Sequence, residues 1–173
     1  LTASAIVNYF QDLTIFHSTD AGATLTYFEE AQRVWVVTSW QIEILRQLKL
    51  GDEITITTWP YNFKSVYGYR NFTITSKGNT SPDIVANSIW VLMDTHSMAP
   101  VKVTEADAHF YQMEEKLDMN YGNRKIKFPQ ESSVGPSFPV TPSDLDTNHH
   151  VNNGKYIQMA ENLLPDNFHY RTI

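Results

Sequence analysis

Residues 144–156 read Asp-Leu-Asp-Thr-Asn-His-His-Val-Asn-Asn-Gly-Lys-Tyr, and the rest of the chain is best interpreted outward from this stretch. Asp146, Asn148 and His150 alternate with other residues. In an extended segment such residues point to one side. The spacing therefore predicts a carboxylate, an amide and an imidazole side by side.

A helix is predicted directly after these residues, over residues 154–164. Asn152 and Asn153 supply side-chain oxygens that can accept from the free N–H groups at its start. A carbonyl placed there would meet unpaired N–H donors and the positive end of the helix dipole. Such a site could polarise a carbonyl group while the imidazole and the amide handle water.

Three other interpretations of the stretch remain open. Asp and Asn are common in turns and caps because they hydrogen-bond their own backbone, so a plain turn followed by a cap also fits. A calcium loop fits badly, because His149 and Lys155 stand where such a loop needs Gly and a bidentate Glu. A transition-metal site fits badly too, since adjacent histidines in a strand face opposite ways and only one could join Asp146.

The run from Ser143 to Ile157 resembles the signature of the acyl-ACP thioesterases, roughly S-D-x-D-x-N-x-H-V-N-N-x-x-Y. Its shorter core, D-x-x-x-H-V-N-N-x-x-Y, is similar to that of many thioesterases with the hot-dog fold. The resemblance implies that Asp146, Asn148 and His150 belong to the catalytic network. It also implies that a further acidic residue, and often a cysteine, follows on a later strand.

Composition limits the class of protein. The chain has 173 residues, of which 42% are hydrophobic, so it can bury a core. It has no cysteine, which excludes disulfides and thiolate zinc sites within it and fits a reducing, cytoplasmic compartment. No apolar run is long enough to span a bilayer, and we expect neither a metal nor another cofactor.

Charge bears on the partners. A net charge of −6 argues against nucleic acid as a partner. It also suits an acidic carrier protein poorly, unless a local basic patch exists. Such a patch could combine Arg124, Lys125 and Lys127 with Lys155, although a solvated linker explains the first three equally well.

Periodicity predicts one helix followed by four strands. Apolar residues at helical spacing predict a helix over residues 3–16, with His17 as a positive group suited to its C-terminal end. A shorter segment follows at 25–33, and a partly helical piece is expected within 105–117. The predicted strands cover residues 35–45, 53–63, 69–76 and 84–94, with Pro60 marking a bulge or an edge and the last strand central.

This order indicates an α+β fold in which an antiparallel sheet wraps around a helix. The hot-dog fold looks like this, and segments such as Trp35–Trp40 and Ser88–Asp94 are similar to those of bacterial acyl-ACP thioesterases. A faint repeat places residues 1–13 over 151–163. Together with the resemblance, it implies a tandem hot dog. Residues 1–128 would form the first unit without its first strand, and 129–173 the strand and helix of an incomplete second unit.

The resemblance implies hydrolysis of fatty acyl-ACP, whose acyl chain is linked to 4'-phosphopantetheine, in fatty acid biosynthesis. Asn148 and His150 would position and activate water while Asp146 fixes their geometry. An acyl-CoA thioesterase, a 3-hydroxyacyl-thioester dehydratase and a non-catalytic acyl-thioester binder remain alternatives, and a homodimer is possible. Residues that could line an acyl pocket, or belong to the plain core, are Trp40, Trp59, Phe63, Phe72, Trp90 and Met93.

Overall fold

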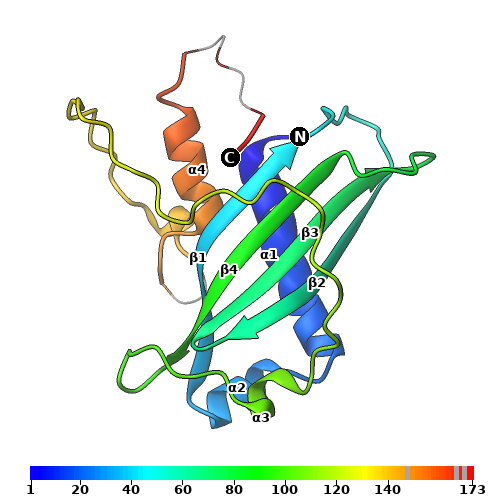
Figure 1. The fold of residues 1–173 in the computed structure, drawn as a ribbon. Coiled ribbons are helices and arrows are strands. Elements are labelled where there is room, and N and C mark those ends of the chain that lie inside the picture. Colours follow the sequence, from blue (N-terminus) through cyan, green and yellow to red (C-terminus); the bar gives the residue numbers. More distant parts are fainter. Residues whose placement is uncertain (147–148, 166–167, 169–170) are drawn as a thin grey trace.

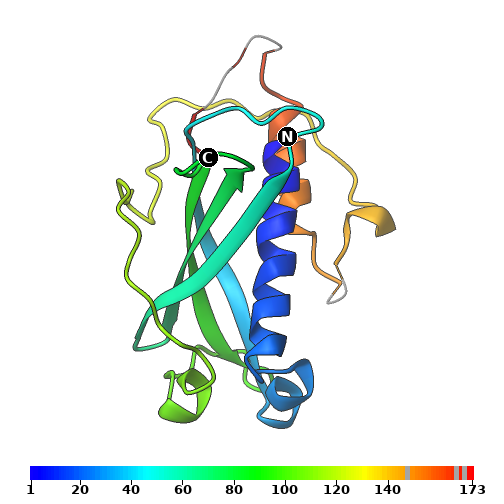
Figure 2. The same ribbon diagram turned by 90° about the vertical axis from the view of Figure 1, so that its right-hand side faces the viewer.

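The computed structural model describes residues 1–146, 149–165, 168 and 171–173. A long helix lies along one face of a four-stranded antiparallel sheet, and a second, shorter helix lies beside the first (Figures 1 and 2). The prediction of an α+β fold with a helix against an antiparallel sheet is confirmed.

The elements follow one another in a simple order. The first helices are α1 (Ala3–Asp20) and α2 (Leu25–Glu30), and the strands are β1 (Arg33–Ile44), β2 (Ile54–Lys64), β3 (Tyr67–Ser76) and β4 (Ile84–Asp94). After them come α3 (Glu105–Ala108), the 3-10 helix η1 (Pro142–Asp144) and α4 (Asn153–Glu161). The strands lie in the order β1-β4-β3-β2, so β4 is central as predicted.

The core lies between α1 and the sheet. Ile6, Val7 and Phe10 of α1 are fully buried. Phe10 stacks on Trp40 of β1 and packs against Phe72 of β3, with ring centroids 6.0 and 4.6 Å apart respectively. Trp40 and Phe72 therefore belong to the core rather than to an open acyl pocket.

Pro60 is tolerated because of its place in the sheet. It lies on the edge strand β2, and the pairing with β3 shifts register between Pro60 and Asn62. Both the edge and the bulge predicted for this residue are present. Proline has no N–H to donate. On an edge strand its nitrogen can face away from the neighbouring strand, so no hydrogen bond of the ladder is lost.

His17 differs from its predicted role. It lies in the last turn of α1, but its pKa is lowered, first by burial and then by the nearby positive charge of Arg70. Its Nδ1 lies 3.2 Å from Arg70 Nη1. His17 thus lies at the end of the helix as predicted, but its lowered pKa disfavours the positive imidazole that the prediction assumed.

The opposite face of the sheet is crossed by the segment that follows α3, as Figures 1 and 2 show. Leu117 N–H and Tyr121 O–H donate to Asn71 Oδ1, and Glu114 N–H donates to the carbonyl of Pro60. This coverage explains why β3 is buried on both faces. Of the helical piece predicted over 105–117, only the four residues of α3 form.

The second half of the chain is less regular than predicted. No strand forms between Phe138 and Leu145, where residues 142–144 instead make the 3-10 helix. The last three residues lie against the free edge of β1. Ile42 N–H donates to Ile173 O at 2.8 Å, and Ile173 N–H donates back to Ile42 O at 2.9 Å. In the described part of the chain, no helix combines the length and apolarity needed to cross a membrane.

Candidate active site

Residues 144–146 pair with residues 149–152 just before α4, and we call this pairing the hairpin. Leu145 and Val151 form an antiparallel bridge, and Asn152 N–H donates to Asp144 O at 2.8 Å. Asp146 N–H donates to His150 O, also at 2.8 Å. The stretch is therefore not the extended segment on which the predicted alternation depended.

The hairpin nevertheless brings Asp146 and His150 together. His150 N–H donates to Asp146 Oδ1 at 3.0 Å, so the carboxylate holds the backbone of the histidine. His149 occupies the turn with a φ of +60°, a left-handed conformation that histidine adopts more readily than most residues. Both histidines are exposed. Asn148, the third predicted site residue, lies outside the described residues.

The start of α4 follows directly from the hairpin. Asn152 is the N-cap, and its Oδ1 accepts from Gly154 N–H at 2.8 Å. Asn153 does not cap the helix, although the sequence suggested both asparagines for that task. Its Nδ2 instead donates to Gln11 Oε1 of α1 at 2.7 Å. The two neighbouring asparagines thus have different roles, one within α4 and one between helices.

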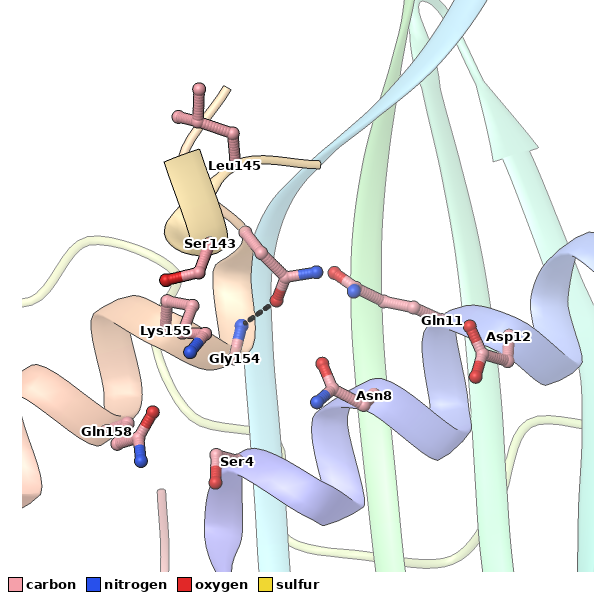
Figure 3. A pocket seen from close by; sticks show the side chains of 10 residues that line it. Ser4, Asn8, Gln11, Asp12, Ser143, Leu145, Gly154, Lys155 and Gln158 are labelled. Atoms are coloured by element: carbon pink, nitrogen blue, oxygen red, sulfur yellow. Dashed lines mark hydrogen bonds between the residues drawn. The ribbon is translucent and has the colours of Figure 1, made fainter. Parts of the chain in front are cut away.

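A polar pocket of about 400 Å³ lies between α1 and α4. Asn8 and Gln11 of α1 face Gly154 and Lys155 of α4 across it (Figure 3). Asp146 and His150 are not among its lining residues, but their neighbours Leu145 and Asn152 are. The pocket therefore lies beside the hairpin, at the N-terminal end of α4.

The charged side chains at the start of α4 partly neutralise each other. Lys155 Nζ lies 3.7 Å from Asp144 Oδ1. Hydrogen bonds from the backbone and side chain of Thr141 hold the pKa of Asp144 below its usual value, and Lys155 adds to the effect. Lys155 is thus paired with an acid. The predicted basic run is exposed, and its Arg124 lies 4.9 Å from the centre of the Tyr67 ring of β3.

The arrangement suits attack on a carbonyl group. The start of α4 offers the N–H of Asn153, which donates to no described residue, and the positive end of the helix dipole. The exposed imidazole of His150 lies two residues before the cap. The described residues contain no group of three His, Asp or Glu side chains placed to hold a metal ion.

Sequence reasoning missed the contribution of α1 to this site. Ser4, Asn8, Gln11 and Asp12 line the pocket, and their spacing places them on one face of the helix. This polar stripe beside the buried apolar face is a signal present in the sequence, but only the position of α4 shows what it contacts.

Comparison with known proteins places the chain in a family. Residues 1–111 match the acyl-ACP thioesterase N-terminal domain, and residues 127–172 match the acyl-ACP thioesterase C-terminal domain. An acyl-[acyl-carrier-protein] hydrolase of Cuphea viscosissima is 28% identical over 167 residues, covering 88% of this chain and 40% of the relative. Oleoyl-acyl carrier protein thioesterase 1 of Arabidopsis thaliana is 28% identical over 182 residues, covering 95% of this chain and 50% of the relative. The chain thus spans about half or less of the length of these relatives.

Solved structures support the same fold. The 12:0-ACP thioesterase of Umbellularia californica superposes with a TM-score of 0.82 at 20% identity, covering 99% of this chain and 72% of that one. A putative oleoyl thioesterase of Lactobacillus plantarum gives a TM-score of 0.77 at 23% identity, covering 95% of this chain and 64% of that one. These likenesses show that the helix and sheet form a hot-dog fold. The two domain matches, which together span most of the sequence, show that the chain belongs to the acyl-ACP thioesterase family.

Proposed function

We propose that this chain carries part of the active site of an enzyme that hydrolyses fatty acyl-ACP to a free fatty acid and ACP, in fatty acid biosynthesis. One observation carries the proposal. The hairpin bond from His150 N–H to Asp146 Oδ1 brings two signature residues together just before the capped start of α4. Family membership supplies the substrate class.

The reaction needs a nucleophilic water and a place for the oxyanion. Water adds to the thioester carbonyl carbon while the N–H of Asn153 and the positive end of the α4 dipole stabilise the developing negative charge. Asn148 orients the water and His150 takes its proton, while Asp146 fixes the hairpin. Collapse of the tetrahedral intermediate breaks the C–S bond, and protonated His150 gives its proton to the departing thiolate.

The carrier protein is the finer part of the proposal. The relatives named above act on acyl groups attached to ACP, and an acyl-CoA thioesterase is the alternative. Rates on one acyl group carried by ACP and by CoA would separate the two, with faster turnover of acyl-ACP expected. A cytoplasmic location remains a prediction from the cysteine-free sequence, and the plant relatives are described as chloroplastic.

The neighbouring histidines allow a matched test. In the intact protein, His150→Asn removes the proposed base, while His149→Asn makes the same change at the adjacent exposed position. Asn tolerates the positive φ of residue 149, so this control should fold. We expect free-thiol release from acyl-ACP to fall by about 100-fold or more for His150→Asn. His149→Asn should stay near the unsubstituted rate. Equal rates for the two variants would remove His150 from the mechanism.

A further inference from the structure

The start of α4 is held by a helix from the other half of the chain. Asn153 Nδ2 donates to Gln11 Oε1 at 2.7 Å, although the two residues are 142 positions apart in sequence. Both side chains are half-buried. Among the described residues this is the only side-chain hydrogen bond that joins α1 to α4.

Gly154 brings the two helices into close contact at the same place. A Cβ atom on Gly154 would lie 2.6 Å from Asn8 Oδ1 and 3.1 Å from the capping oxygen of Asn152. A side chain at this position would have to displace the amide of Asn8 and crowd the capping oxygen of Asn152. The first turn of α4 therefore lies against Asn8, as Figure 3 shows. In the same turn, Asn153 is bonded to Gln11.

Little else within α4 fixes its direction. The helix has nine residues, and a helix of that length is marginal without tertiary contacts. Gly154 is its only buried residue, and Ile157 adds a partly buried contact with the core. The hydrogen bond to Gln11 therefore adds a directional contact to the packing of α4 on α1.

That start is where the reacting carbonyl would be polarised. We propose that Gln11 is a positioning residue for thioester hydrolysis: by bonding the side chain of Asn153 it aims that residue's N–H at the oxyanion. Among the first N–H groups of α4, this is the one that donates to no described residue. The inference rests on the proposed function. It gives the first hot-dog unit a direct part in a site whose signature residues all lie in the second.

The test compares three variants of the intact protein. Gln11→Met keeps a long side chain but removes the acceptor oxygen, whereas Gln11→Glu keeps an acceptor at the same reach. Gln112→Met makes the first change at an exposed glutamine after α3, which does not line the pocket. We expect kcat for acyl-ACP to fall about tenfold in Gln11→Met, the effect of one lost hydrogen bond, with KM little changed. Gln11→Glu and Gln112→Met should retain most of kcat.

Two further measurements separate positioning from a general loss of structure. Amide hydrogen exchange at Lys155 and Tyr156, whose N–H groups donate to Asn152 O, should quicken in Gln11→Met and not in Gln112→Met. Gln11→Met should also add no further loss of kcat to an Asn153→Ala variant, which has neither donor nor acceptor for Gln11.

The outcomes distinguish this inference from the proposed function. If the unsubstituted protein hydrolyses acyl-ACP and Gln11→Met matches its kcat, the inference is overturned and the proposed function stands. A loss confined to KM would also overturn it, since Gln11 would then contact the substrate itself. Absence of hydrolysis by the unsubstituted protein would overturn both.

Discussion

Arg70 is a buried arginine whose guanidinium contacts a side chain of α1 and one of β2. Its side chain is 6% exposed, and burial lowers its pKa to about 10, which leaves it protonated near neutrality. Its Nη1 donates to Thr58 Oγ1 at 3.2 Å and lies against His17 Nδ1. A neutral imidazole can accept from the guanidinium, while a protonated one would repel it. The fold therefore favours His17 without its extra proton.

This preference predicts a loss of stability in acid. The pKa of His17 is lowered in the folded state relative to the unfolded value of about 6.5, so the unfolded chain binds the extra proton first. The contribution is complete above pH 6.5 and is lost as pH falls toward the folded pKa. It amounts to about 1.4 kcal/mol at most per pH unit across that window. Urea unfolding between pH 7.5 and 5.5 measures it.

The matched variants are His17→Gln, which keeps an acceptor for Arg70, and His96→Gln, which removes an exposed histidine. The first should flatten the fall in unfolding free energy between pH 6.5 and 5.5, and the second should leave it as it is. An unchanged slope in His17→Gln would contradict the assignment.

At the scale of elements, the turn between β3 and β4 is closed by one buried carboxylate. Asp83 is 2% exposed, and its Oδ2 accepts from Ser76 N–H and Ser76 O–H, both at 2.6 Å. Asn79 Nδ2 donates to its Oδ1, and the side chain of Arg46 beyond β1 pairs with it. A single residue thus ties the ends of three strands together.

We predict that Asp83→Ala lowers the unfolding free energy by about 2 kcal/mol, since it leaves the Ser76 N–H of a central strand without its partner. The hydrogen bond to Arg46 holds the pKa of Asp83 well below its usual range, so this stabilisation is present above about pH 4 and is lost in stronger acid.

Glu53→Ala provides the control. Its carboxylate pairs with Lys77 at 2.8 Å, but both side chains are more than two-thirds exposed. That variant should cost less than about 1 kcal/mol. Equal shifts in the urea midpoint for the two variants would argue against a special role for the buried carboxylate.

Elements with strong local periodicity could be predicted from sequence. The strand predicted over residues 84–94 has those bounds in the structure, because its apolar run and flanking turns are local signals. The hairpin before α4 could not be predicted from sequence, because its turn places His149, and not a glycine, in the left-handed conformation. Likewise Asn153 looks like a second capping residue until α1 is placed next to it.

At the scale of the whole molecule, the N-terminal and C-terminal parts of the chain contact each other both in the helix layer and in the sheet layer. In the helix layer α4 lies beside α1, and in the sheet layer residues 171–173 extend the edge of β1. An open edge strand is a site for unwanted pairing, and this contact covers part of it. No sequence pattern predicts the pairing, because it joins residues some 130 positions apart that carry no shared signal.

The edge pairing can be tested by hydrogen exchange in the intact protein. Ile42 N–H donates to Ile173 O, and Ile44 N–H donates to Arg171 O at 2.8 Å. We predict that Ile173→Pro, which removes the N–H that bonds to Ile42 O, speeds exchange at these two amides roughly tenfold. The amide of Glu43 should stay protected, because alternation in an antiparallel ladder directs it toward β4. Thr172→Ala, a change at an exposed neighbour, should alter neither. Unchanged exchange at Ile42 in Ile173→Pro would mean that residues 171–173 do not protect this edge in solution, and that the sheet of the first unit ends at β1.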